Sequence, residues 1–281
     1  AAVDAMRNGL NAMAMKGRIV IGEGERDEAP MLYIGEEVGS GEGPEIDIAL
    51  DPLEGTSLTA KGMANALAVL ALAPRGELLH APDTYMDKIA VGAGVEAGVV
   101  DLDLDPADNV RRLAEAKGCP VSDLTACVLE RERHDHIVEA LRGVGVRVNL
   151  IPDGDVAGVI AVADPDGDAD IYIGRGGAPE GVLAAAALRC FGGWMQGRLH
   201  FRTDEERERA KRVGVSDLDR TYALEELAGP RCLFVATGVT DGHLLDGPHR
   251  TGAAVRTESL LLSSVTGYRR RIISTRPVPS S

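Results

Sequence analysis

The sequence predicts an α/β fold, because short buried strands alternate with helices along most of the chain. Residues 46–51 alternate between aliphatic and mostly polar side chains, as a strand with two different faces does. Residues 124–151 follow as strand, helix and strand. Residues 171–173 form a further strand, which leads through a glycine-rich run into an alanine-rich helix.

The first part of the chain is expected to contain one helix and three strands. Apolar residues at near-helical spacing predict a helix within residues 1–16, and the aliphatic residues at 18–21 predict a buried strand that ends at Gly22. The alternating residues 46–51 form the second strand, and the apolar run at 67–72 forms the third.

The remainder of the chain alternates between the two kinds of element. Capping residues and proline at a first helical turn mark where helices begin. In chain order we expect a helix at 106–116 capped by Asp105, a strand at 124–129, a helix at 134–141, a strand at 146–151, a helix after Asp153, a strand at 171–173, a helix whose first turn holds Pro179 and Glu180, and a strand-rich segment at 232–275. Residues 118–121 are the best boundary, which predicts two subdomains over 1–121 and 122–281.

The composition of the chain argues against two classes of binding partner. The 281 residues are 44% hydrophobic, which is enough for one large core or two moderate ones. A formal net charge of −14 opposes attraction to nucleic acid or to an anionic membrane, and aromatic residues, at 3%, offer few platforms for stacking bases. The longest apolar run, 64–73, is far shorter than the ~20 residues of a membrane span. We therefore expect neither a nucleic acid nor a membrane as partner.

The cysteines indicate the compartment. The four residues show no C-x-x-C spacing, which argues against a zinc site or a disulfide framework, and free thiols fit the reducing cytoplasm. Cys127 and Cys190 are interpreted as small core residues rather than nucleophiles. The chain begins at Ala1 without an initiator methionine, so a further segment upstream is expected.

Acidic residues gather where two of the expected strands end. The turn Gly22-Glu23-Gly24-Glu25 follows the strand at 18–21, with Asp27 and Glu28 just beyond it. Glycines on both sides of Glu23 allow a sharp turn that presents its carboxylate. Taken alone, a solvated acidic turn is the favoured interpretation of this segment.

A second acidic bend, Asp51-Pro52-Leu53-Glu54-Gly55-Thr56, is more informative. Pro52 fixes φ and Gly55 permits a close backbone approach, so that Asp51 and Glu54 can face one point. Carboxylate oxygens are the ligands that Mg²⁺ or Mn²⁺ prefers, and the Thr56 hydroxyl can contact a phosphate or orient a water molecule.

The run D-P-L-E-G-T resembles the D-P-[IL]-[DE]-G-[ST] signature of the lithium-sensitive, metal-dependent phosphatases, which include inositol monophosphatases and fructose bisphosphatases. A narrower resemblance, to the class II or GlpX-type fructose-1,6-bisphosphatases, extends over most of the chain in family order. It is carried by I-V-I-G-E-G-E-R-D-E-A-P-M-L-Y-I-G-E at 19–36, A-N-A-L-A-V-L-A at 64, A-P-D-T-Y-M at 81, I-P-D-G-D-V-A at 151 and G-G-A-P-E-G at 176.

This resemblance implies a layered αβαβα sandwich of the sugar phosphatase type. Residues 1–121 would then form a metal-binding catalytic subdomain and residues 122–281 a sugar-phosphate-binding one. The implied reaction is the metal-dependent hydrolysis of the 1-phosphate of fructose 1,6-bisphosphate to fructose 6-phosphate, a step of gluconeogenesis, with two or more Mg²⁺ or Mn²⁺ ions per site. A cytoplasmic homo-oligomer, a dimer or a tetramer, is expected.

The resemblance also assigns roles to single residues. Thr56, assisted by Asp27, would position the attacking water molecule. The implied metal ligands are Glu23, Asp51, Glu54 and Glu180. The implied substrate contacts are Glu54, Gly55, Thr56, Tyr85, Arg131, Glu132, Arg133, Asp153, Gly154, Asp155 and Gly177. Backbone amides at the start of the helix after Gly177 suit an anion.

The chain departs from the family pattern in three places. The family has a further acidic ligand upstream of its own A-A-V, and this sequence starts at that A-A-V. Glu132 places an acid where the family has proline in a basic-Pro-Arg pattern. The segment 203–227 is also shorter than the family leads us to expect, which bears on the subunit contacts.

Other residues near these motifs have a structural interpretation as well as a functional one. Arg131 and Arg133 alternate at a strand end and could bind the non-reacting phosphate, or lie on a solvated edge. Asp153 and Asp155 flank Gly154 before a helix, where an aspartate N-cap is the common interpretation. His134 and the neighbouring histidine at 136 are interpreted as structural.

Three alternative functions remain. The Gly174-x-Gly176-Gly177 run suggests a nucleotide-binding oxidoreductase, but no acidic residue closes the next strand about twenty positions on, as the dinucleotide fingerprint requires. A sedoheptulose-1,7-bisphosphatase, or a bifunctional enzyme, would act on the same reacting end of its substrate. A non-catalytic, metal-binding sugar-phosphate sensor would retain every ligand and lack turnover.

Overall fold

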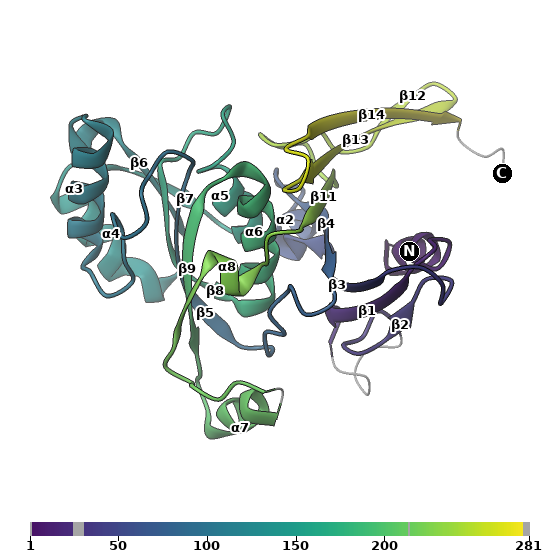
Figure 1. The fold of residues 1–281 in the computed structure, drawn as a ribbon. Helices are drawn as coiled ribbons and strands as arrows, with labels where there is room; N and C mark the ends of the chain where they lie inside the picture. The colour runs from purple at the N-terminus through teal and green to yellow at the C-terminus, as the bar shows by residue number, and fades with distance from the viewer. Residues whose placement is uncertain (1, 25–30, 213, 278–281) are drawn as a thin grey trace.

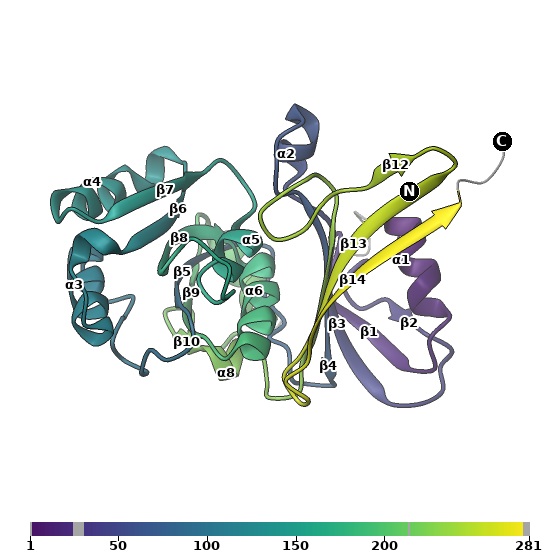
Figure 2. The ribbon, with the colours of Figure 1, turned by 90° about the horizontal axis from the view of Figure 1, so that it is seen from above.

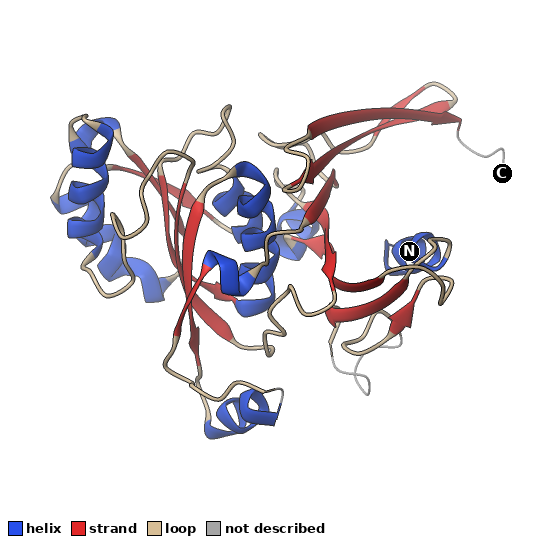
Figure 3. Cartoon of the chain, viewed as in Figure 1, coloured by secondary structure: helices blue, strands red, loops and turns tan. Residues whose placement is uncertain are grey.

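The computed structural model describes residues 2–24, 31–212 and 214–277, whose strands form two sheets (Figures 1 and 3). The first sheet has eight strands in the order β12-β13-β11-β4-β3-β1-β2, with β14 paired to β13. Their bounds are β1 Lys16–Ile21, β2 Glu37–Val38, β3 Glu45–Glu54, β4 Leu67–Pro74, β11 Leu233–Gly238, β12 His249–Thr251, β13 Ala254–Ser263 and β14 Arg269–Pro277.

The second sheet has six strands in the order β10-β9-β5-β8-β6-β7. Their bounds are β5 Tyr85–Val91, β6 Thr125–Leu129, β7 Arg147–Ile151, β8 Ile171–Gly177, β9 Trp194–His200 and β10 Thr221–Ala223. The first sheet takes strands from both ends of the chain, and the second takes those between. The division at residues 121 and 122 stays a prediction about subdomains.

The helices complete a layered arrangement. Their bounds are α1 Ala2–Asn11, α2 Thr56–Lys61, α3 Pro106–Lys117, α4 Asp135–Gly143, α5 Asp155–Ile160, α6 Ala178–Phe191, α7 Asp204–Arg212 and α8 Leu224–Leu227, with short 3-10 turns at Val121–Asp123 and Glu132–His134. Among the helices of the described residues, none has the length and apolar character needed to cross a membrane.

Figure 2 shows the order of the layers, from α1 on one outer side to α3 and α4 on the other. The helix α6 packs against β3 and β4 of the first sheet and against β5, β8 and β9 of the second, so it forms the middle layer together with α5. The helices α3 and α4 cover the outer face of the second sheet, and α1 covers the first. The predicted αβαβα sandwich is confirmed.

The sequence of β3 accounts for its position between two layers. Ile48 and Leu50 point to the outer side and pack in one cluster with Leu10 of α1. Ala49 faces the opposite way, into the large core around α6. Because both faces of the strand are covered, alternation in β3 separates large from small side chains rather than apolar from solvated ones.

The middle helix α6 is rich in alanine because helices and sheets surround it. Eleven of its fourteen residues are buried, among them the consecutive alanines 184–187. Small side chains allow two sheets to approach one helix from opposite sides, and close packing leaves little room for longer ones. This helix therefore holds its first turn, with Glu180, at a fixed place between the sheets.

Most of the predicted elements are present, but the strands β2 and β10 and the helices α2, α7 and α8 were not predicted. The strands β5 and β9 were not expected. The glycine-rich run 174–177 was expected to form a loop, but it belongs to β8 and pairs with β5, Tyr85 lying opposite Gly177. Pairing on both sides of β5 explains why a short, mixed sequence forms a central strand.

Candidate active site

A cleft with a cavity volume of about 310 Å³ lies between the two sheets. It gathers residues from β3, β5 and β8, from the segments that follow β6 and β7, and from the first turns of α2, α5 and α6. Its lining consists of Asp51, Leu53, Glu54, Gly55, Thr56, Tyr85, Leu129, Arg131, Arg133, Asp153, Asp155, Gly176, Gly177 and Glu180. The lining includes every predicted substrate contact except Glu132 and Gly154.

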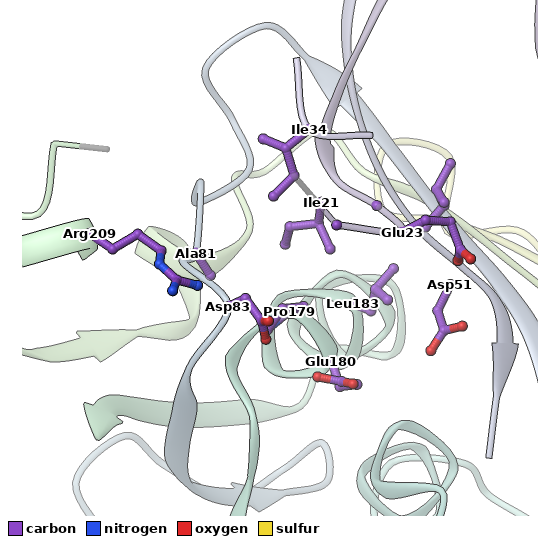
Figure 4. Close-up of a pocket in the computed structure, with 13 residues that line it drawn as sticks. Ile21, Glu23, Ile34, Asp51, Ala81, Asp83, Pro179, Glu180, Leu183 and Arg209 are labelled. Atoms are coloured by element: carbon purple, nitrogen blue, oxygen red, sulfur yellow. The ribbon is translucent and has the colours of Figure 1, made fainter. Parts of the chain in front are cut away.

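A second pocket, of about 220 Å³, adjoins the cleft and shares Asp51 and Glu180 with it. Figure 4 shows this pocket, with Glu23 and Asp51 on one side, Glu180 on α6 and Arg209 on the other side. The four residues predicted as metal ligands therefore line two connected spaces. Asp27, predicted to assist Thr56, lies outside the described residues.

The Asp51-to-Thr56 run forms a bulged strand end followed by a helix. The pairing of β3 with β4 shifts register between Asp51 and Glu54, and the backbone N–H of Leu53 donates to Asp51 Oδ1 at 2.9 Å. Gly55 has a φ of 83°, a left-handed conformation, and a Cβ there would lie 2.8 Å from the Leu58 side chain. The glycine thus lets the chain turn from β3 into α2, which begins at Thr56.

Glu54 is buried, with 3% of its surface exposed, and its two oxygens differ. Oε1 accepts a hydrogen bond from the backbone N–H of Val156 at 3.2 Å, whereas Oε2 has no partner among the described residues. Burial, followed by the charges of Asp155 and Asp51, raises the pKa of Glu54 well above its usual value.

Asp51 and Glu180 share this environment. Burial raises the pKa of Asp51 to about 6, and the charges of Glu23 and Asp155 add to the effect. Burial and the charge of Asp155 raise the pKa of Glu180 to about 7. Glu180 Oε2, like Glu54 Oε2, is buried without a partner in the described part of the chain. The carboxylates therefore disfavour one another's ionised forms.

These observations fit a site for divalent cations. Hard cations take carboxylate oxygens, and a bound cation would supply both the missing partners and the missing charge. Within residues 2–24, 31–212 and 214–277, no three His, Cys, Asp or Glu side chains already stand at the spacing of a metal site. The orphaned oxygens and the raised pKa values are the features that favour a cation; the ligand set of Glu23, Asp51, Glu54 and Glu180 stays a prediction.

Lys88 is a site residue that the sequence interpretation missed. It lies in β5, is fully buried, and its ammonium donates to Asp155 Oδ2 and, at 2.9 Å, to the Gly177 carbonyl. Lys88 lies two residues from each of the apolar Met86 and Ala90 and shares their buried face of the strand, but no local pattern identifies its partner. A lysine on the buried face of a strand requires a buried partner, and that partner is Asp155.

The two arginines after β6 reach the cleft in a different way from that expected. The strand ends at Leu129, so Arg131 and Arg133 do not alternate along it; Arg133 lies in the 3-10 turn Glu132–His134. Arg131 donates to the Pro152 carbonyl at 2.6 Å. Arg133 donates twice to the Arg175 carbonyl, at 2.7 and 3.2 Å. Backbone carbonyls, rather than strand geometry, thus hold both guanidinium groups at the cleft.

The Tyr85 ring lies between two guanidinium groups. Arg133 is 4.9 Å and Arg202 is 4.8 Å from the ring centroid, distances typical of cation–π contacts. Tyr85 begins β5 and is half-buried at the rim of the cleft. This part of the cleft is therefore basic, while the part around Glu54 is acidic.

The segment before α5 corrects the capping interpretation. The N-cap residue of α5 is Gly154, with a φ of 85° and no side-chain hydrogen bond to the helix. Asp153 faces Arg131 at 3.7 Å, and Asp155 binds Lys88. Neither aspartate caps the helix, because other partners take both carboxylates. Gly154 lines a separate pocket that shares Asp153 with the cleft.

Glu132 and His134 are placed by the same short turn. Glu132 is exposed and does not line the cleft, so its substrate contact stays a prediction. His134 is buried, its Nδ1 lies 2.7 Å from the Leu129 carbonyl, and its Nε2 accepts from the Arg175 N–H at 2.8 Å. Burial lowers the pKa of His134. This side chain holds β6 to β8, which confirms its structural role.

The cysteines are free, and the two interpreted as core residues are buried. All four are free thiols. Burial raises the pKa of Cys127 to about 12 and that of Cys190 to about 11, so neither is poised as a thiolate nucleophile.

Comparison with known proteins places this chain in a family. A model of the family described as bacterial fructose-1,6-bisphosphatase, glpX-encoded, matches residues 1–276. The chain belongs to this family.

Individual family members align with almost the whole of this chain in sequence. A relative named fructose-1,6-bisphosphatase 1 class 2, from Escherichia coli strain K12, is 48% identical over 98% of this chain and 85% of its own length. A second relative from the same strain, fructose-1,6-bisphosphatase 2 class 2, is 47% identical over 93% of this chain and 85% of its own length. The family consists of metal-dependent phosphatases. Asp51 and residues 53–56 of the D-P-L-E-G-T run line the cleft described above.

Proposed function

We propose that the chain is a phosphoric monoester hydrolase that releases the 1-phosphate of fructose 1,6-bisphosphate, giving fructose 6-phosphate and phosphate in gluconeogenesis. One observation carries the proposal. In a chain of the fructose-1,6-bisphosphatase family, a single cleft collects an acidic end around Glu54 and a basic end around Arg133. A substrate with phosphates at both ends of a sugar requires such a polarised cleft.

The acidic end would hold the ions and the reacting phosphate. Glu23, Asp51, Glu54 and Glu180 would bind two or more Mg²⁺ or Mn²⁺ ions. When bound, these ions neutralise the transferring phosphoryl group and lower the pKa of the attacking water molecule. Neutralisation by them would also let the carboxyl groups ionise at neutral pH, since it removes the mutual repulsion that raises their pKa values.

Thr56 would orient the attacking water molecule, with the help of Asp27. Thr56 is the first residue of α2, directly after the left-handed Gly55, and it lines the cleft together with Glu54. Orientation in line with the leaving oxygen would add a geometric contribution to the activation that the ions supply when bound.

The basic end would hold the distal phosphate and the sugar. Arg131 and Arg133 offer forked donors for the phosphate, and Tyr85 offers a ring edge and a hydroxyl at the rim. Asp153 and Asp155 would accept hydrogen bonds from sugar hydroxyls. The backbone at Gly177, just before the long helix α6, suits an anion.

The enzyme is proposed to work in the cytoplasm as a homo-oligomer, a dimer or a tetramer. Four free cysteines agree with a reducing compartment.

One assay tests the function. Phosphate release is measured from fructose 1,6-bisphosphate, sedoheptulose 1,7-bisphosphate and inositol phosphate, each with Mg²⁺, with Mn²⁺ and with a chelator. The expected result is metal-dependent release from fructose 1,6-bisphosphate and little from inositol phosphate. Faster release from the seven-carbon substrate would assign the alternative specificity. No release from any of them, with sugar phosphate still bound, would show a sensor.

A further inference from the structure

Lys88 is a buried cation that contacts one of the carboxylates of the cleft, that of Asp155. Its side chain is fully buried in β5, the central strand between β9 and β8. Its ammonium donates to Asp155 Oδ2 and to the Gly177 carbonyl, and it acts against the burial and charge effects that raise the pKa of Glu180. The Lys88 side chain thus lies beneath the acidic end of the cleft.

Glycines make the room that this lysine occupies. The residues opposite Lys88 on the two neighbouring strands are Gly174 and Gly197. A Cβ on Gly176 would lie 2.0 Å from Asp155 Oδ2 and 3.0 Å from Lys88 Nζ. The glycine-rich end of β8 therefore accommodates the ion pair between Lys88 and Asp155, which a side chain at Gly176 would displace.

The ion pair connects three elements that build the cleft. Lys88 comes from β5, Asp155 begins α5, and Gly177 precedes α6 with Glu180 in its first turn. Asp155 is 6% exposed and lines the cleft. Its Oδ2 is taken by Lys88, whereas its Oδ1 has no hydrogen-bond partner in the described part of the chain. Lys88 therefore fixes Oδ2 of Asp155, and Oδ1 remains available to a ligand in the cleft.

Stability alone does not explain this arrangement. A buried ion pair is often no more stabilising than a pair of apolar residues, because both charges lose their hydration. Without Lys88, Asp155 would be a further unpaired carboxylate beside Asp51, Glu54 and Glu180, whose ionised forms it already disfavours. Such a carboxylate would itself attract a divalent cation.

We propose that Lys88 is a positioning residue: its ammonium holds Asp155 so that this carboxylate accepts hydrogen bonds from the sugar phosphate instead of binding a metal ion. The inference rests on the proposed function of the cleft. It goes beyond that function, because it makes Lys88 responsible for separating the carboxylates that bind metal from those that bind sugar.

The test uses the full chain with Lys88→Met, Asp155→Asn and the double variant, and Lys16→Met as the matched control. Lys16 lies at the exposed start of β1, away from the cleft. Three quantities are measured: Mn²⁺ binding to metal-depleted protein by calorimetry, fructose 6-phosphate binding in chelator, and the kcat and KM for fructose 1,6-bisphosphate.

Lys88→Met is expected to bind Mn²⁺ at least about tenfold more tightly than the wild type, because the ion regains Asp155 as a ligand. The double variant restores wild-type Mn²⁺ affinity, since it removes one charge of each sign. Both Lys88→Met and Asp155→Asn weaken fructose 6-phosphate binding and raise KM by about tenfold, with a smaller effect on kcat. Lys16→Met changes none of these quantities.

Unchanged Mn²⁺ affinity in Lys88→Met would overturn the inference. So would fructose 6-phosphate binding that is clearly weaker in the double variant than in Asp155→Asn, because Lys88 would then act on the sugar directly. This second comparison holds even if Lys88→Met does not fold, since the double variant leaves no buried charge unpaired. If the wild type releases no phosphate, the proposed activity fails, while the Mn²⁺ comparison still decides the role of Lys88.

Discussion

The Glu54 carboxylate accepts a hydrogen bond from the backbone N–H of Val156, 3.2 Å away and 102 residues further along the chain. Glu54 ends β3 of the first sheet, whereas Val156 lies in the first turn of α5, which packs on the second sheet. The bond joins the D-P-L-E-G-T run to the helix that begins with Asp155. Changes at Glu54 are therefore expected to affect the cleft as a whole as well as the bound metal.

Glu54→Gln should lower metal-dependent turnover by on the order of 10²-fold, because a neutral amide is a weak ligand for a divalent cation. The same change should stabilise the metal-free protein at neutral pH. The amide oxygen still accepts from Val156, and no charge remains to be buried. Phosphate release at saturating Mn²⁺ and the thermal midpoint in chelator measure the two effects.

Glu96→Gln is the matched control for this change, because Glu96 is exposed in the loop after β5 and far from the cleft lining. It should leave both quantities unchanged. Near-normal turnover in Glu54→Gln would remove Glu54 from the ligand set.

The metal-free protein should lose stability as the pH rises from about 4 to about 7. Asp51 has a folded pKa of about 6 and Glu180 one of about 7, both above their values in an unfolded chain. A group with a raised folded pKa stabilises fully below its unfolded pKa and loses that contribution as the pH passes its folded pKa. For Asp51 alone the loss is up to about 3 kcal/mol.

His134, whose pKa is lowered, acts in the opposite direction near pH 6, so the informative quantity is a difference between proteins. Unfolding free energies in chelator are compared for the wild type and Asp51→Asn across this range. The variant should show the flatter dependence, and adding Mg²⁺ should raise the wild-type stability most at the upper end. Parallel curves for the two proteins would contradict the shifted pKa of Asp51.

Thr56→Ala should lower kcat by about 10²-fold while changing KM little, because the hydroxyl is proposed to act on the attacking water and not on the bound sugar. Thr56→Ser should recover most of the rate. Ser57→Ala removes a neighbouring hydroxyl on the same helix and serves as control, since Ser57 does not line the cleft. An equal loss in KM and kcat would instead assign Thr56 to substrate binding.

Much of the fold followed from patterns within single segments. The alternation in β3, the proline in the first turn of α6 and the strand-rich end of the chain each predicted an element that the structure contains. The strand β5 was missed because pairing with β8 and β9, rather than a pattern in its own sequence, makes this segment a strand. Met86, Lys88 and Ala90 face a shared core, which a local pattern with a lysine in it does not indicate.

The candidate site, like the fold, has one part that was predictable from the sequence and one part that was not. The run from Asp51 to Thr56 is contiguous, so its chemistry was readable from sequence and from its resemblance to a family. Lys88 and the Val156 N–H belong to the site only through contacts across 67 and 102 residues. Long-range pairs of this kind have no local signal, because neither partner's neighbours in sequence reveal the other.

Gly177→Ala should reduce turnover by about tenfold or more through displacement of Glu180. A Cβ at this position would lie 1.9 Å from Glu180 Oε2, a contact that the first turn of α6 can relieve only by moving the carboxylate. Mn²⁺ binding by calorimetry should weaken in parallel. Gly143→Ala, at the end of α4 with open space around it, is the control and should alter neither quantity.

Arg133→Lys should raise KM for fructose 1,6-bisphosphate by about tenfold and leave kcat within about threefold of the wild type. The guanidinium donates twice to the Arg175 carbonyl while its face lies over the Tyr85 ring. A lysine retains the charge but has neither the fork nor the flat face, so the distal phosphate would lose a fixed partner. Arg142→Lys, on the exposed last turn of α4, makes the same chemical change away from the cleft. The reacting phosphate is proposed to lie at the other end of the cleft. A fall in kcat with unchanged KM would therefore show that Arg133 contacts the transferring group, and the two ends of the substrate would have to be exchanged.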